Sequence, residues 1–227
     1  MRLASLLSGG KDSVYSIQLA MESGHEVTHA VTVFPERDDS YMFHVPNLWL
    51  TRLQADAMGV EFVAWASSGV KEDEVEDLRD ALRTVDVEGV VLGAIASNYQ
   101  RSRVSGVCGQ LGLNVFAPLW GIEGGTHLDR LVDIGYRVMI VGVYADGMGP
   151  EWLGRIIDED AIADLRELNR TRGVGISFEG GEAETLVLDC PIFSRRLSVV
   201  RAEVSWEGPR GEYLIHEASL REEANPE

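Results

Sequence analysis

A tight glycine turn between a strand and a helix, close to the N-terminus, constrains the fold of this chain most. Residues 3–7 form a short apolar run of strand length, and the apolar residues of segment 14–21 recur at helical spacing. Between them lies the hexapeptide Ser8-Gly9-Gly10-Lys11-Asp12-Ser13, called the glycine hexapeptide below. Open α/β sheets bind ligands at such turns, beyond the carboxyl ends of their strands. We therefore expect a ligand site here.

The glycine hexapeptide combines several groups suited to phosphate. Its two glycines let the backbone approach an anion, and the first free amides of the helix point toward it. Lys11 adds a positive charge, and Ser8 and Ser13 add hydroxyl donors. The segment is not a P-loop, because Ser5 stands where the first glycine of that pattern belongs and Asp12 follows the lysine.

Asp12 is unusual beside a phosphate site. A carboxylate there makes most sense with a cation such as Mg²⁺ between it and the phosphates. The alternative is an acidic residue in the first helical turn, stabilised by the helix dipole. The sequence leaves both interpretations open.

Bulk composition narrows the class of partner. The formal net charge of −17 opposes binding to phosphate backbones, so it argues against a nucleic-acid partner. The chain begins with a strand rather than a signal peptide, and no apolar run is long enough to span a bilayer. Its two cysteines, Cys108 and Cys190, form no CxxC pair. We expect a cytoplasmic protein with no membrane partner.

Buried strands alternate with amphipathic helices through the first half of the chain, which predicts a parallel sheet with helices on both faces. The loop after residue 117 marks a boundary, so we predict one domain over 1–122 and a smaller α+β domain over 123–227. The second domain is expected to end in a hairpin around the four-residue turn 208–211. The further strands expected are 26–34, 60–66, 89–93, 113–117 and 136–144, and the helices 47–58, 71–85, 128–134 and 159–172.

Polar residues cluster at 97–103, just past a buried strand and at the same sheet edge as the glycine hexapeptide. Arg101 and Arg103 have forked donors that suit phosphate or carboxylate. The alternative is a helix start with Ser97 as its N-cap and both arginines facing solvent. Cys108 falls in the apolar row of the following helix, which places it in the core.

The segment 179–185, called the acidic segment below, carries three glutamates and two glycines before an apolar run. Carboxylates this close together are unfavourable unless a cation or donor group lies near them. A cationic substrate, an amine or Mg²⁺ would meet that need, and an acidic solvent-exposed turn is the alternative.

In its strand–helix setting, the glycine hexapeptide resembles the pyrophosphate (PP) loop of N-type ATP pyrophosphatases. Four further motifs, in chain order, resemble the diphthine–ammonia ligase family of such proteins: Ser-Asn-Tyr-Gln-Arg at 97–101, Ala-Pro-Leu-Trp at 117–120, Trp-Leu-Gly at 152–154 and Glu-Gly-Gly-Glu-x-Glu-Thr-Leu-Val-Leu-Asp-x-Pro at 179–191. The last motif discriminates best. Ala183 departs from the family pattern, which usually has Tyr there.

This resemblance implies a Rossmann-like (HUP-type) α/β domain and ATP-dependent amidation of the diphthine carboxylate on translation elongation factor 2. Ammonia would displace AMP from an acyl-adenylate after pyrophosphate has left. ATP and Mg²⁺ are the implied cofactors, with Asp12 as the metal ligand and Lys11 and Asp12 as the catalytic pair. The implied source is archaeal, and a homodimer is compatible with the sequence.

The resemblance also implies which residues bind ATP and which bind the protein substrate. Glu182 and Glu184 would offer charge complementary to the trimethylammonium group of diphthine. The implied ATP contacts are Ser8, Gly9, Gly10, Lys11, Asp12, Ser13, Arg101 and Arg103. The implied substrate contacts are Ser97, Asn98, Tyr99, Gln100, Glu179, Gly180, Gly181, Glu182, Glu184 and Thr185.

Two other functions stay open on sequence alone. A PP-loop enzyme that modifies tRNA is one, although thiolating types commonly use paired cysteines. A nucleotide-binding sensor without catalysis is the other, and it would bind ATP without releasing AMP.

Overall fold

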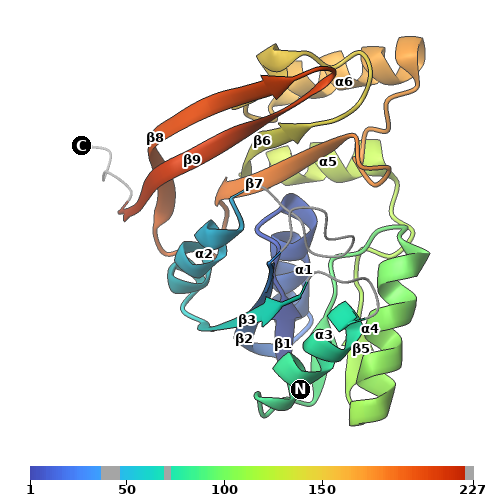
Figure 1. The fold of residues 1–227 in the computed structure, drawn as a ribbon, viewed down its shortest axis with the longest axis vertical. Coiled ribbons are helices and arrows are strands. Elements are labelled where there is room, and N and C mark those ends of the chain that lie inside the picture. Colours follow the sequence, from blue (N-terminus) through green and yellow to red (C-terminus); the bar gives the residue numbers. More distant parts are fainter. Residues whose placement is uncertain (37–46, 69–72, 223–227) are drawn as a thin grey trace. The chain divides into compact units, whose positions relative to one another are not determined.

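The computed structural model describes residues 1–36, 47–68 and 73–222 (Figure 1). The chain forms two compact units, Met1–Gly121 and Ile122–Glu227. Among the described residues, none of the helices has both the length and the apolar character needed to cross a bilayer.

The first unit contains a five-stranded sheet in the order β3-β2-β1-β4-β5, with every neighbouring pair parallel. The chain runs outward from β1 to β3, then returns to the other side of β1 for β4. The carboxyl ends of β1 and β4 therefore meet at the point where the strand order reverses. The strands are β1 Arg2–Leu6, β2 Glu26–Pro35, β3 Glu61–Ser67, β4 Gly89–Val91 and β5 Asn114–Phe116.

Helices cover both faces of this sheet, as the alternating sequence pattern predicted. Right-handed crossovers put α1 and α2 on one face and α3 and α4 on the other. The apolar residues of α3 and α4 share one core cluster with Ala4, Val31 and Val90 of the sheet. The helices are α1 Lys11–Glu22, α2 Thr51–Met58 (after a 3₁₀ turn, η1 Leu48–Leu50), α3 Asp73–Arg83 and α4 Asn98–Leu111.

The second unit is an α+β domain with a four-stranded antiparallel sheet in the order β7-β6-β9-β8. Helices α5 and α6 contact each other in this unit. The strands are β6 Arg137–Val143, β7 Ala183–Asp189, β8 Arg196–Glu207 and β9 Arg210–Arg221, and the helices are α5 Gly124–Asp133, η2 Pro150–Trp152 and α6 Glu159–Arg172.

Two local predictions in this unit are wrong. The hairpin turn has two residues, Gly208 and Pro209, because Glu207 pairs with Arg210. Gly208 has φ +60°, the left-handed conformation that a type II′ turn requires at its first central position. Helix α5 begins at Gly124 rather than at residue 128, because the Glu123 side chain caps it.

Candidate functional site

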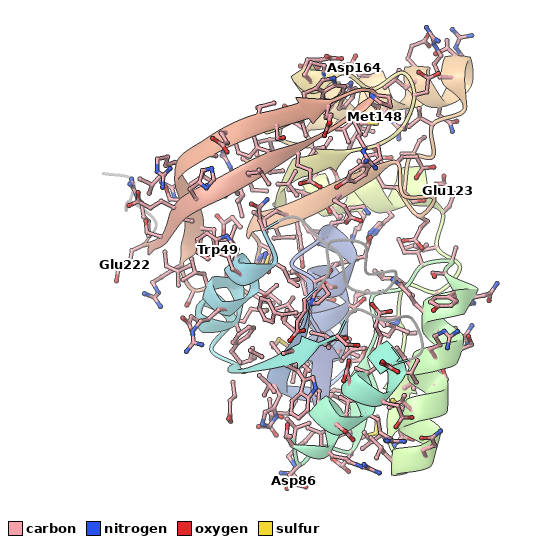
Figure 2. All side chains as sticks on the ribbon, in the orientation of Figure 1. Trp49, Asp86, Glu123, Met148, Asp164 and Glu222 are labelled. Carbon is pink, nitrogen blue, oxygen red and sulfur yellow. The ribbon has the colours of Figure 1, made fainter. Side chains whose placement is uncertain are left out.

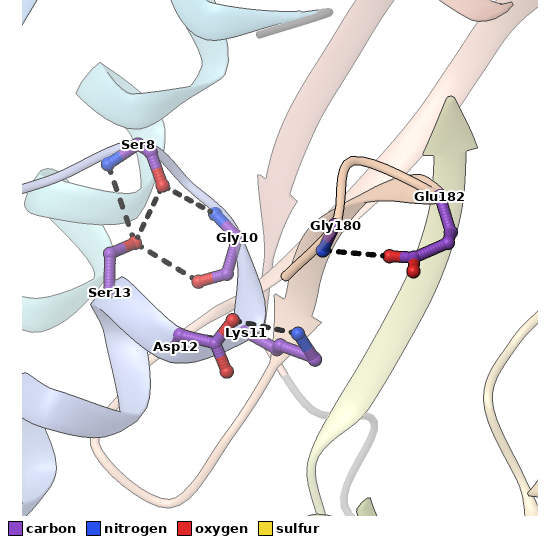
Figure 3. A network of polar contacts seen from close by, with 7 residues as sticks. All are labelled: Ser8, Gly10, Lys11, Asp12, Ser13, Gly180 and Glu182. Atoms are coloured by element: carbon purple, nitrogen blue, oxygen red, sulfur yellow. Dashed lines mark hydrogen bonds and ion pairs between the residues drawn. The ribbon is translucent and has the colours of Figure 1, made fainter. Parts of the chain in front are cut away.

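The glycine hexapeptide forms the turn between β1 and α1, as the sequence predicted. A hydrogen-bond network inside it fixes its shape (Figure 3). The Ser13 hydroxyl donates to the Gly10 carbonyl oxygen at 3.0 Å, and its oxygen accepts from the Ser8 hydroxyl at 3.1 Å and the Ser8 amide at 3.3 Å. Both serine hydroxyl protons are therefore used within the turn. In this arrangement the two serines order the backbone amides rather than point their own protons at a ligand.

Lys11 and Asp12 form an ion pair at the start of α1. The Lys11 Nζ lies 2.7 Å from an Asp12 carboxylate oxygen, and the two side chains are 3% and 20% exposed. A buried ammonium group requires a charged or polar partner, which Asp12 supplies. The pair holds the Lys11 ammonium in the first turn of the helix, at the positive end of the helix dipole, which favours anions.

The first turns of α4 carry Arg101 and Arg103, the second set of predicted ATP contacts. Ser97 is the N-cap, because its hydroxyl accepts from the Gln100 amide at 3.4 Å. The capping interpretation of Ser97 is thus confirmed. The guanidinium of Arg101 stacks on the Trp120 ring at 4.2 Å, and that of Arg103 stacks on the Tyr99 ring at 4.3 Å. Stacking occupies the face of a guanidinium and leaves its edge for hydrogen bonds.

Two residues that the sequence did not single out also contact the glycine hexapeptide. Gln54 of α2 donates a hydrogen bond from Nε2 to the Gly9 carbonyl oxygen at 2.9 Å. Gly93, just after β4, lies against the backbone of Asp12 and Ser13. No sequence spacing points to either residue, because each contacts backbone atoms of the hexapeptide that only the folded chain brings near.

In the second unit, the acidic segment is organised by Glu182 (Figure 3). Its carboxylate accepts from the Gly180 amide at 2.9 Å and from the Gly175 amide at 3.2 Å. Phe178, which is buried, has φ +65°, a left-handed conformation that costs a non-glycine residue about 1–3 kcal/mol. Backbone donors thus meet part of the negative charge that led us to expect a cation.

Glu184 lies in a row of paired residues across the antiparallel sheet. Gly142 of β6 pairs with Glu184 of β7 on one side and with Glu212 of β9 on the other. The Tyr144 ring lies over Gly142, and its hydroxyl donates to Glu212 at 3.0 Å. Burial raises the pKa of Tyr144 far above its usual value, and the charges of Glu212 and Glu184 add to the effect. Tyr144 therefore stays a protonated donor.

Of the remaining predicted substrate residues, Thr185 is buried in β7 and Gly181 is exposed at the turn before that strand. Ala183 is buried in β7 and pairs with Val143. The strand therefore begins at the position at which the family usually has Tyr. Sequence reasoning missed Tyr144 and Glu212, because strand register alone brings them beside Glu184.

Glu123, labelled in Figure 2, is the N-cap of helix α5. Its carboxylate accepts from the Thr126 hydroxyl and from the amides of Thr126 and Gly125 at 2.7–2.9 Å. These bonds, the Thr126 hydroxyl first, lower the pKa of Glu123 to about 2. The carboxylate thus stays charged at the N-terminus of α5 and stabilises that helix.

Neither cysteine is poised for nucleophilic chemistry. Cys108 is fully buried in the core of the first unit, as predicted, and Cys190 is buried in the second. Burial raises their pKa values to about 11 and about 12, so both stay protonated thiols near neutral pH. This state disfavours the paired-cysteine chemistry of thiolating enzymes.

Comparison with models of known protein families shows which family the chain belongs to. The model of the diphthamide synthase N-terminal domain matches residues 1–115, and that of the C-terminal domain matches residues 125–220. The chain belongs to the diphthamide synthase family. The family resemblance predicted from the motifs is therefore confirmed.

Two curated relatives agree with this assignment. The diphthine–ammonia ligase of Homo sapiens is 35% identical, over 90% of this chain and 85% of its own length. That of Danio rerio is 34% identical, over 89% of this chain and 88% of its own length. A solved structure from Methanocaldococcus jannaschii, described as a predicted subunit of tRNA methyltransferase, is 17% identical with a TM-score of 0.45 over 84% of this chain and 98% of that one.

Proposed function

We propose that this chain is an ATP-dependent ligase that amidates the diphthine carboxylate of translation elongation factor 2 with ammonia. The observation that carries the proposal is the family match over both units, in a chain whose first unit has a buried lysine in the first turn of a helix at the sheet switch point. We propose that it works in the cytoplasm, where its protein substrate acts.

In this proposal, the glycine hexapeptide binds the triphosphate of ATP. The amides at the start of α1 and the Lys11 ammonium stabilise the negative charge that builds on pyrophosphate as it leaves. Preorganised electrostatic stabilisation of this kind is often the largest single catalytic contribution. Arg101 and Arg103 bind the nucleotide or the carboxylate through the edges of their stacked guanidinium groups.

The proposed reaction has two steps. An oxygen of the diphthine carboxylate attacks the α-phosphorus, the bond to the β-phosphate oxygen breaks, and pyrophosphate leaves. Ammonia then attacks the carbonyl carbon of the acyl-adenylate, loses one proton to solvent and displaces AMP. The products are the amide, AMP and pyrophosphate.

Asp12 is the residue proposed to hold Mg²⁺. Among the residues that the structure describes, no group of three His, Cys, Asp or Glu side chains is placed to hold a metal ion. Mg²⁺ is commonly bound through one or two carboxylates together with substrate phosphates, so a single Asp12 carboxylate beside a phosphate site fits it. When bound there, the ion neutralises phosphate charge.

The second unit is proposed to bind the protein substrate. Glu184 and the Tyr144 ring offer a carboxylate and an aromatic surface, and both favour a quaternary ammonium group. Glu182 then shapes the acidic segment through its two backbone bonds rather than contacting the cation itself. The other substrate contacts implied by the resemblance stay predictions.

The decisive experiment mixes the chain with ATP, Mg²⁺, an ammonium salt and diphthine-bearing elongation factor 2. We expect AMP and amidated factor in equal amounts. When ammonium is omitted we expect neither product, because AMP then stays bonded to the substrate in the acyl-adenylate. Elongation factor without diphthine is the matched control. ATP binding without AMP release under the full mixture would instead indicate a sensor.

A second arm separates this function from tRNA thiolation. Because both thiols are buried, the test replaces Cys108 and Cys190 with Ala rather than alkylating them. The folded variant should keep AMP formation, because no thiol takes part in the proposed steps. Loss of turnover in a folded variant would favour the thiolating alternative.

A further inference from the structure

Two residues outside the glycine hexapeptide fix its backbone from opposite sides. Gln54 reaches it from α2, and Gly93 reaches it from the segment after β4. Neither residue is among the predicted ligand contacts, and each is far from the hexapeptide in sequence. Their contacts raise the question of what they contribute to a phosphate site.

Gln54 fixes one peptide plane of the turn. Its side chain is fully buried, and its Nε2 lies 2.9 Å from the Gly9 carbonyl oxygen. Gly9 has φ +87°, so the turn leaves regular geometry at this residue. The carbonyl and amide of a trans peptide unit point in opposite directions. Holding the Gly9 carbonyl toward α2 therefore aims the Gly10 amide to the other side, where it donates to the Ser8 hydroxyl oxygen at 3.4 Å within the turn.

Because Gly93 has no side chain, the first turn of α1 can lie directly against the segment after β4. A Cβ added at Gly93 would lie 2.7 Å from the Ser13 amide nitrogen and 2.8 Å from both the Asp12 carbonyl carbon and the Ser13 Cα. All three are backbone atoms, so they cannot move aside as the end of a side chain can. A methyl group at residue 93 must therefore displace the turn that carries Lys11, Asp12 and their amides.

We propose that Gln54 and Gly93 are positioning residues for the phosphate site, which hold the hexapeptide amides and Lys11 in their binding geometry. This inference rests on the proposed ATP-dependent function. Its physical basis is that a binding site loses affinity when its supporting contacts let it loosen or shift by about 1 Å. The ammonium and protein substrates do not depend on this backbone.

The test compares Gly93→Ala with Gly106→Ala. Gly106 lies inside α4, its added Cβ meets nothing within 4 Å, and it is not in the site. For Gly93→Ala we expect kcat/KM for ATP to fall by about 10- to 100-fold and the Kd for ATP to rise. The KM for ammonium should stay at the wild-type value. Gly106→Ala should match wild type in every constant.

Gln54 supplies an independent arm. Gln54→Met keeps the volume but removes the donor, and we expect kcat/KM for ATP to fall by about tenfold. Gln54→Glu places an acceptor against the Gly9 carbonyl oxygen, so its loss should be larger. Thermal unfolding of each variant monitors the fold, and the Gln54 pair carries the test if Gly93→Ala does not fold.

Three results would overturn the inference. One is wild-type kcat/KM for ATP in folded Gly93→Ala and Gln54→Met. Another is an equal rise in KM for ATP and for ammonium, which would indicate general loosening of the fold. The third is no difference between Gln54→Met and Gln54→Glu. Failure of the wild-type chain to release AMP overturns the proposed function instead, and the Kd for ATP then still tests Gln54 and Gly93.

Discussion

The glycine hexapeptide and the acidic segment are both glycine-containing turns closed by short polar networks, but they use their backbone amides differently. In the hexapeptide, the Gly10 amide donates to the neutral Ser8 hydroxyl, and the Lys11 ammonium lies in the first turn of α1. In the acidic segment, the amides of Gly175 and Gly180 bind the carboxylate of Glu182. The first turn thus carries a cation of its own, which the proposed function assigns to an anionic ligand, and the second holds a negative charge of its own.

Lys11 should give the largest effect in this comparison. Lys11→Met removes the positive charge of the hexapeptide, and we expect kcat for AMP formation to fall by about 10²–10³-fold, as for other lost electrostatic contacts to a transition state. The assay is steady-state AMP release with saturating substrates. Arg83→Met, which removes an exposed cation of α3, is the control and should keep wild-type activity. Unchanged kcat in Lys11→Met would break the proposed role of the hexapeptide.

Glu182 should give the next largest effect, on the other substrate. Glu182→Ala leaves two amides without their carboxylate, and bonds to charged groups contribute about 1.5–3 kcal/mol each. We therefore expect KM for the protein substrate to rise by about tenfold or more while KM for ATP is unchanged. Glu182→Gln keeps one acceptor and should fall between wild type and Glu182→Ala. A change in KM for ATP alone would contradict the assignment of Glu182 to the protein substrate.

Glu184 should have a smaller effect, because it is half-buried rather than fully desolvated. Ion pairs in contact with water contribute up to about 1 kcal/mol, so Glu184→Gln should raise KM for the protein substrate by up to about fivefold. High salt should shrink the difference from wild type. Glu207→Gln, at the exposed end of β8, is the matched control. Equal effects of the two changes would mean that only net charge matters.

Glu123 should give the smallest effect, on stability rather than catalysis. Its pKa is lowered from 4.5 to about 2 in the folded chain, so its charged form stabilises the fold above pH 4.5, and this contribution is lost as the pH falls toward 2. We expect Glu123→Gln to lower the melting temperature at neutral pH, with the difference from wild type closing on acidification. A difference that does not change with pH would mean that the cap does not depend on charge.

The sequence predicted the first unit well, because its signals are local. Strands and helices alternate along the chain, and the turn at Ser8–Ser13 leads from the first strand into the first helix. The N-cap of α4 was also recognisable, since Ser97 immediately precedes the helix it caps. The family followed from several motifs in a fixed order.

The parts that could not be predicted depend on distant pairing. The order β7-β6-β9-β8 brings Glu212 and Tyr144 beside Glu184, and no spacing in the chain encodes that register. Gln54 and Gly93 act on backbone groups, so their chemistry has no motif. The hairpin turn was placed wrongly, because Gly-Pro-Arg-Gly contains two glycines and only Gly208 occupies the turn. The archaeal source and the homodimer stay predictions.

The central position of β1 has a consequence for how the chain matures during synthesis. Its sheet neighbours are β2, which begins at Glu26, and β4, which begins at Gly89. The ribosome therefore releases all six residues of the glycine hexapeptide long before the strand that supports one side of it exists. A nascent chain halted ahead of β4 carries every residue of the hexapeptide in an unfinished sheet, so the proposed nucleotide binding is tied to completion of the first unit.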